Sequence, residues 1–73
     1  MRCKVRLIWD SEARIWYTTS DDIPGLILHA DSFDGLVERV MIAAPEMLDD
    51  NLNYIGPIQI TFEAERIEES VVV

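Results

Sequence analysis

The chain has 73 residues, a formal net charge of −8 and a single cysteine. A chain this short forms one domain, residues 1–73, and a domain of this size buries only about 60% of the surface that its unfolded form exposes. We therefore expect marginal stability unless a partner covers part of the surface. One cysteine excludes an internal disulfide and, without a Cys/His cluster, argues against a structural zinc site.

The N-terminus lacks the pattern of a signal peptide, and no apolar run reaches the ~20 residues that span a bilayer. We therefore expect a soluble, cytoplasmic protein with no membrane contact. Residues 1–20 sum to a charge of +2 and residues 21–73 to −10. Because binding to phosphates requires cations, this balance argues against direct nucleic-acid binding and favours a basic protein partner.

Two strands are predicted at the start of the chain. Residues 1–9 alternate between an apolar and a largely basic face, which indicates a strand. Residues 10–13 form a short polar connection typical of a hairpin. Residues 15–20 are rich in β-branched and aromatic side chains, so they are predicted to be the second strand.

A corner and a short third strand are predicted next. In residues 21–25, Pro24 fixes φ and Gly25 supplies the positive φ that a type II turn requires. Residues 26–30 are largely apolar and are predicted to be the third strand.

A helix follows, because the apolar spacing changes from two residues to three or four. Asp31 or Ser32 is expected to cap its N-terminus. Pro45 lacks a backbone donor, so we expect a kink or break near Ala44. The predicted core-facing stripe comprises Phe33, Leu36, Val37, Val40, Met41, Ala44 and Leu48.

A fourth strand is predicted after a loop at residues 51–57, because apolar and polar residues alternate from Ile58 to Glu65. A right-handed crossover from the third strand places this strand parallel to the first. The predicted fold is therefore α+β: a three-stranded antiparallel meander, one helix packed on the sheet, and a fourth strand parallel to the first, in the order β-β-β-α-β.

The candidates for chemistry each have a simpler structural interpretation. Asp21 and Asp22 are more simply turn residues than a metal or acid/base pair. His29 has no nucleophile spaced to pair with it, and Cys3 lies in a strand pattern as a small buried hydrophobe. The basic stripe of the first strand is expected to pair with Glu63 and Glu65 of the fourth. The sequence therefore predicts no enzyme activity, catalytic residue, metal site or cofactor.

One sheet face is left uncovered by a single helix, and we expect apolar side chains on it. Trp16 and Tyr17 are adjacent in a strand, so one of the two lies on the helix-free face. Such a patch on a small domain is usually covered, which predicts a homo-oligomer. The third strand adds Ile27 or the pair Leu26 and Leu28 to this face, and Ile42 lies exposed on the far side of the helix. The expected interface residues are Ile8, Trp16, Tyr17, Ile27 and Ile42.

Several short segments resemble the small bacterial HicB-like domains. They are Trp9-Asp10, Glu12-Ala13, Ile15-Trp16, the run from Ser20 to Leu26, Ala30-Asp31-Ser32, Pro45-Glu46 and Leu48. The resemblance implies a degraded ribonuclease H-like sheet without the catalytic acids. It also implies self-association and inhibition of HicA, a small basic RNA-cleaving toxin. Many such domains carry a DNA-binding segment after the fourth strand; this chain does not, so we expect no promoter binding by it alone. The family's usual capping Thr and Glu appear here as Ser32 and Gly35.

Two function classes follow. The first is a non-catalytic antitoxin-type module that binds a basic HicA-like toxin. The second is a homo-oligomeric structural or ligand-binding domain without a toxin partner. For the first class, the expected contacts are carboxylates at the corner and on the helix, namely Asp21, Asp22, Asp34, Glu38 and Glu46.

Overall fold

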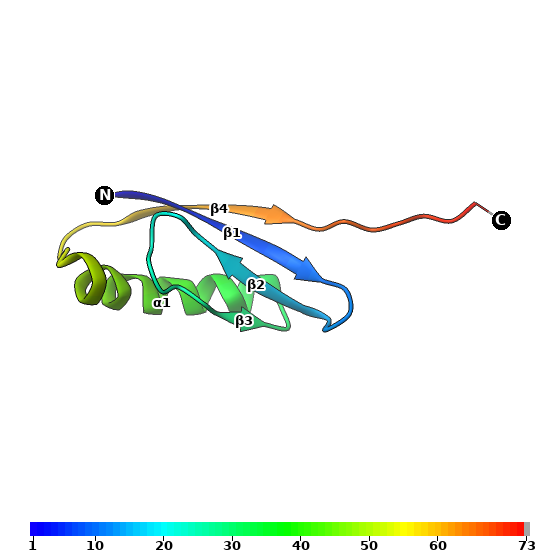
Figure 1. Ribbon diagram of the computed structural model, residues 1–73, viewed down its shortest axis with the longest axis horizontal. Coiled ribbons are helices and arrows are strands. Elements are labelled where there is room, and N and C mark those ends of the chain that lie inside the picture. Colours follow the sequence, from blue (N-terminus) through cyan, green and yellow to red (C-terminus); the bar gives the residue numbers. More distant parts are fainter. Residues whose placement is uncertain (73) are drawn as a thin grey trace.

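One four-stranded sheet with a helix on one face makes up the fold (Figure 1). The computed structural model describes residues 1–72, and its strands lie in the order β3-β2-β1-β4. β1 pairs antiparallel with β2 and parallel with β4, which confirms the predicted fold class. The elements are β1 (Arg2–Asp10), β2 (Ile15–Thr19), β3 (His29–Ala30), α1 (Phe33–Leu52) and β4 (Gln59–Glu65).

The core lies between β1 and α1. The odd residues of β1 point toward the helix, because side chains alternate between the two faces of a strand. The buried residues of α1 are spaced by four, which places them on the one side of the helix that faces the sheet. Full burial of each Leu, Ile or Val side chain contributes roughly 1.5–3 kcal/mol. The buried core comprises Cys3, Val5, Leu7, Ile23, Leu26, Leu36, Val40, Ala44 and Leu48.

The predicted corner is confirmed. The amide of Leu26 donates to the Ile23 carbonyl at 3.3 Å, and Gly25 between them has φ of +80°. These features, with Pro24 before the glycine, are those of a type II turn. Asn51 at the end of α1 donates to the Pro24 carbonyl at 2.9 Å, which ties the corner to the helix.

The third strand is shorter than predicted, His29–Ala30 instead of residues 26–30. The reason is Thr18, a buried side chain of β2. Its hydroxyl accepts from the Leu28 amide at 3.0 Å and bonds to the Leu26 carbonyl at 3.2 Å. The Leu28 carbonyl still accepts from the Thr18 backbone amide at 3.1 Å, but the Leu28 amide bonds to the Thr18 hydroxyl instead of a backbone carbonyl. The regular ladder therefore begins only at His29.

The expected helix break is wrong, because α1 runs unbroken through Pro45. Pro45 lies on the exposed side of the helix, where water can bond to the carbonyl that a proline leaves without an amide. Ser32 caps the N-terminus by accepting from the Gly35 amide at 3.0 Å. Asn53 closes the C-terminus with φ of +53°, its amide bonding to the Asp49 carbonyl.

The helix lies beneath β2 and β3 more than beneath β4. Arg39 on one flank of α1 reaches the β3 edge and donates to the His29 carbonyl at 2.6 Å. Met41, on the opposite flank, is 53% exposed, so its predicted place in the core is wrong. Within residues 1–72, no helix has the length and apolarity needed to cross a membrane.

Candidate functional site

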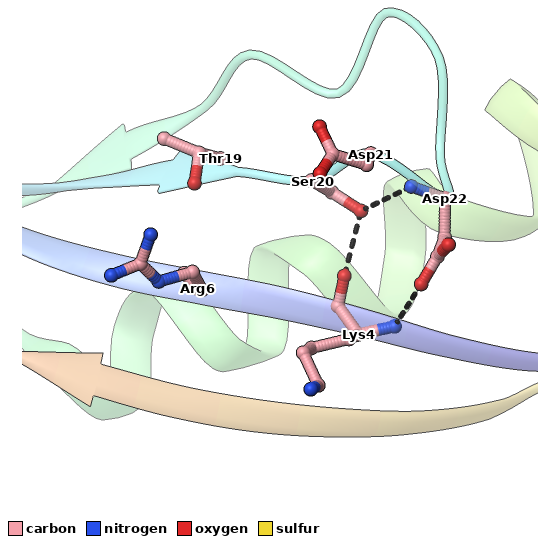
Figure 2. Close-up of a pocket in the computed structure, with 6 residues that line it drawn as sticks. All are labelled: Lys4, Arg6, Thr19, Ser20, Asp21 and Asp22. Carbon is pink, nitrogen blue, oxygen red and sulfur yellow. Dashed lines mark hydrogen bonds between the residues drawn. The ribbon is translucent and has the colours of Figure 1, made fainter.

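A groove of about 390 Å³ lies where the corner meets β1 and β2 (Figure 2). The Asp22 carboxylate accepts from the Lys4 amide at 2.7 Å, and the Ser20 hydroxyl donates to the Lys4 carbonyl at 2.7 Å. The same hydroxyl accepts from the amides of Asp22 and Ile23. Side chains of the corner thus bond to β1 beyond the end of β2, which gives Ser20 and Asp22 a structural role.

The cations beside this groove are paired with β4, as the sequence predicted. Lys4 Nζ lies 3.3 Å from Glu63, and Arg6 lies 3.1 Å from Glu65. Both pairs are exposed and reach diagonally across the parallel ladder, so each contributes at most about 1 kcal/mol. Their main effect is to neutralise Lys4 and Arg6 on a sheet face that also carries Asp21.

The potential catalytic groups do not converge. Among residues 1–72 no three His, Cys, Asp or Glu side chains are placed to hold a metal ion. His29 is exposed on β3. Cys3 is buried, as predicted. Burial, and then the nearby Asp22 carboxylate, raise the pKa of its thiol, so it stays protonated at neutral pH and is a poor nucleophile.

The outer face of α1 is acidic. Asp34, Glu38 and Glu46 are exposed along it, and Asp49 extends the same side. A spacing of four residues places successive side chains on one face of a helix. Ile42 lies within this row and is 73% exposed. We call these five residues the acidic ridge.

The predicted partner contacts therefore fall on two surfaces. Asp21 and Asp22 line the groove on the helix-free side of the sheet. The helix carboxylates Asp34, Glu38 and Glu46 lie on the outer side of α1, with the sheet between the two groups. Only the second group forms a continuous acidic surface.

The predicted interface residues are also separated. Tyr17 pairs with Ile8 on the helix-free face, whereas Trp16 faces the helix and packs against the core, so Trp16 does not belong to that face. Ile27 is 86% exposed beside the corner, and Ile42 belongs to the acidic ridge. The helix-free face is mainly polar, since the even residues of β1 and the odd residues of β4 occupy it.

An aromatic cluster is the feature that the sequence interpretation missed. Trp9 and Trp16 lie directly opposite each other in the hairpin, with ring centroids 5.4 Å apart, and Phe33 meets Trp16 edge-on at 5.3 Å. The Arg66 guanidinium lies 4.4 Å from the Trp9 ring. The four-residue loop between Asp10 and Ile15 was the available signal, because it fixes this register.

Comparison with known proteins identifies relatives without a described activity. Residues 2–73 match a family described as a domain of unknown function, DUF1902. The structure is similar to the crystal structure of hypothetical protein TTHA1013 from the extremely thermophilic bacterium Thermus thermophilus, with a TM-score of 0.82 and 32% identity. That match covers 96% of this chain and 100% of the other. No curated protein matches.

Proposed function

We propose that this chain, which belongs to the family described as a domain of unknown function, DUF1902, is a non-catalytic protein-binding module of the HicB-like antitoxin type. The description of the family assigns no activity to it. In this proposal the partner is a small, basic, HicA-like protein that cleaves RNA. The chain neutralises it by covering its surface and performs no chemistry of its own.

The observation that carries this proposal is the acidic ridge. Its carboxylates take part in none of the three ion pairs formed within residues 1–72. Their charge is directed outward, and the exposed Ile42 among them adds apolar area. A row of carboxylates around an apolar residue suits a partner with a basic rim and a small apolar pocket, since opposite potentials accelerate encounter and apolar burial slows release.

The arrangement of the cations favours a protein partner over nucleic acid. Lys4 and Arg6 are paired with β4 carboxylates, and Arg39 donates to a backbone carbonyl. Arg66 pairs with Glu68 and lies over the Trp9 ring. Arg2 and Arg14 apart, a phosphate backbone would have to displace these contacts, and it would meet a net charge of −8.

The test is to capture the product of a neighbouring gene with the intact chain and to measure association rates across ionic strength. We expect association to slow as salt rises, because exposed charges are screened beyond about 8 Å at physiological ionic strength. The double variant Glu38→Gln/Glu46→Gln should slow association by roughly threefold or more at low salt.

The matched control is Glu12→Gln/Glu69→Gln, which removes the same charge from the hairpin and the C-terminal segment. It should slow association much less than the ridge variant. Equal slowing by both pairs would mean that only net charge matters. Association that is independent of salt would contradict the role of the ridge.

A homo-oligomeric structural domain without a toxin partner is the second candidate. Exposed apolar side chains outside the ridge favour it, among them Ile27 at 86% and Val72 at 96% exposed. Failure to retain any basic partner, together with a stable oligomer, would make this the better assignment.

A further inference from the structure

The two edges of the sheet differ in how they are protected. β3 has only two residues, and Arg39 of α1 covers its edge by bonding to the His29 carbonyl. β4 has seven residues and, in the part of the chain that the structure describes, pairs with β1 alone. A strand edge of this length is a template for another strand, and natural proteins usually cover or interrupt such edges.

The backbone groups at the open edge can be identified. The Gln59 amide donates to the Met1 carbonyl at 2.8 Å, so the odd residues of β4 direct their backbone groups toward β1. Because this direction alternates along a strand, the amides and carbonyls of Ile60, Phe62 and Ala64 point away from the sheet. Within residues 1–72 no other strand pairs with them.

The chain after β4 continues along the strand direction and extends away from the sheet (Figure 1). Residues 66–72 are exposed throughout, and Ile67, Val71 and Val72 are 76%, 81% and 96% exposed. Such β-branched residues are typical of strands that have a neighbour. We call residues 66–72 the tail.

We propose that β4 and the tail of one chain pair antiparallel with β4 and the tail of a second copy, across a two-fold axis. Because a two-fold axis relates the two copies, every contact occurs twice. The tail of each copy therefore lies along the open β4 edge of the other copy. A second copy bound in this way covers both the open backbone groups of β4 and the exposed apolar side chains of the tail. The surface is distinct from the acidic ridge, so the inference does not depend on the proposed toxin partner.

Charge complementarity selects the register. A two-fold axis at residue 65 would place the Glu65 side chains of the two copies opposite each other. An axis at residue 66 would do the same with the two Arg66 side chains. An axis at Ile67 instead places Arg66 opposite Glu68 of the partner subunit, and the same pair recurs across the axis. Arg66 already pairs with Glu68 of its own chain at 2.8 Å, so in this register each arginine lies between two carboxylates. Opposite charges facing each other stabilise an antiparallel pair, and like charges destabilise it.

The remaining pairs of this register are compatible with it. Phe62 lies opposite Val72 of the partner subunit, which is an aromatic–β-branched pair. Ala64 lies opposite Ser70 of the partner subunit. Glu65 lies opposite Glu69 of the partner subunit, but Arg6 already bonds to Glu65 at 3.1 Å and compensates its charge.

Cross-linking tests the register in the full chain. In Ile67→Cys the two introduced thiols face each other at the axis, so mild oxidation should convert most of the protein to a covalent dimer that reductant reverses. In Ser70→Cys, the matched control on the same tail, the two positions lie roughly 20 Å apart, which is too far for a disulfide. Buried Cys3 contributes little background. Cross-linking of neither variant, or of both equally, would overturn the register.

The variant Ala64→Pro tests the edge itself. Its amide points away from β1, so proline removes an edge donor without removing a bond of the sheet. Light scattering should give a dimer for the unchanged chain and a monomer for Ala64→Pro, with the circular dichroism of both alike. A monomeric unchanged chain at tens of micromolar would overturn the proposal. If Ala64→Pro fails to fold, the cross-linking pair decides.

Discussion

At the scale of single residues, Gly25 gives the corner a backbone conformation that other residues adopt only with strain. Its φ of +80° is unfavourable for a residue with a Cβ, and a Cβ there would lie 3.3 Å from the Asn51 amide nitrogen. Gly25→Val should therefore lower the free energy of unfolding by about 1–3 kcal/mol. Gly25→Asn should cost less, because asparagine adopts positive φ more readily.

Urea denaturation of both variants measures these losses. An unchanged midpoint for Gly25→Val would show that the residue does not hold this conformation in solution. Equal losses for the two variants would show that steric crowding by Asn51, and not φ, sets the cost.

The corner also shows what residue patterns can and cannot predict. The turn followed from Pro24 and Gly25, since their preferences are local. The bonds from Ser20 and Asp22 to Lys4 did not, because they join residues 16 and 18 positions apart and depend on how the corner folds over β1. Asp22 was expected to contact a partner, and in the structure its carboxylate accepts from the Lys4 backbone amide of β1.

At the scale of elements, Pro45 offers a direct test of helix energetics. It stands inside α1 on the exposed side, where it leaves the Met41 carbonyl without its helical donor. Pro45→Ala should restore that bond and raise the free energy of unfolding by about 1–3 kcal/mol, since proline costs about 3 kcal/mol relative to alanine in a helix interior.

Glu46→Ala is the control on the neighbouring position and should change stability by less than about 0.5 kcal/mol. Chemical denaturation followed by circular dichroism compares the two. A Pro45→Ala variant no more stable than the unchanged chain would contradict a continuous helix through this residue.

Elements with strong periodicity were predicted well, and those shaped by tertiary contacts were not. The alternation of β1 and the four-residue spacing of α1 identified both sides of the core. The start of β3 was misplaced because the buried Thr18 hydroxyl, and not a backbone carbonyl, accepts from the Leu28 amide. The break at Pro45 was wrong because packing of Ala44 and Leu48 keeps the helix in place.

At the scale of the whole molecule, topology was predictable and surfaces were not. A crossover from β3 returns β4 parallel to β3, and the two antiparallel pairings of the meander then make β4 parallel to β1. Which carboxylates share a surface depends on which side of the sheet each element occupies. The sequence therefore grouped Asp21 and Asp22 with the helix carboxylates, whereas the structure separates them and leaves the acidic ridge on α1.

The most direct measurement of the proposed function is a titration of the full chain into the RNA-cleaving activity of a small basic protein encoded beside its gene. We expect cleavage to fall to background as the two proteins approach stoichiometric amounts, with Glu38→Gln/Glu46→Gln requiring more protein than Glu12→Gln/Glu69→Gln. The chain alone, with magnesium present, should leave the RNA intact. Undiminished cleavage in large molar excess of the chain, or cleavage of RNA by the chain itself, would contradict an antitoxin-type module.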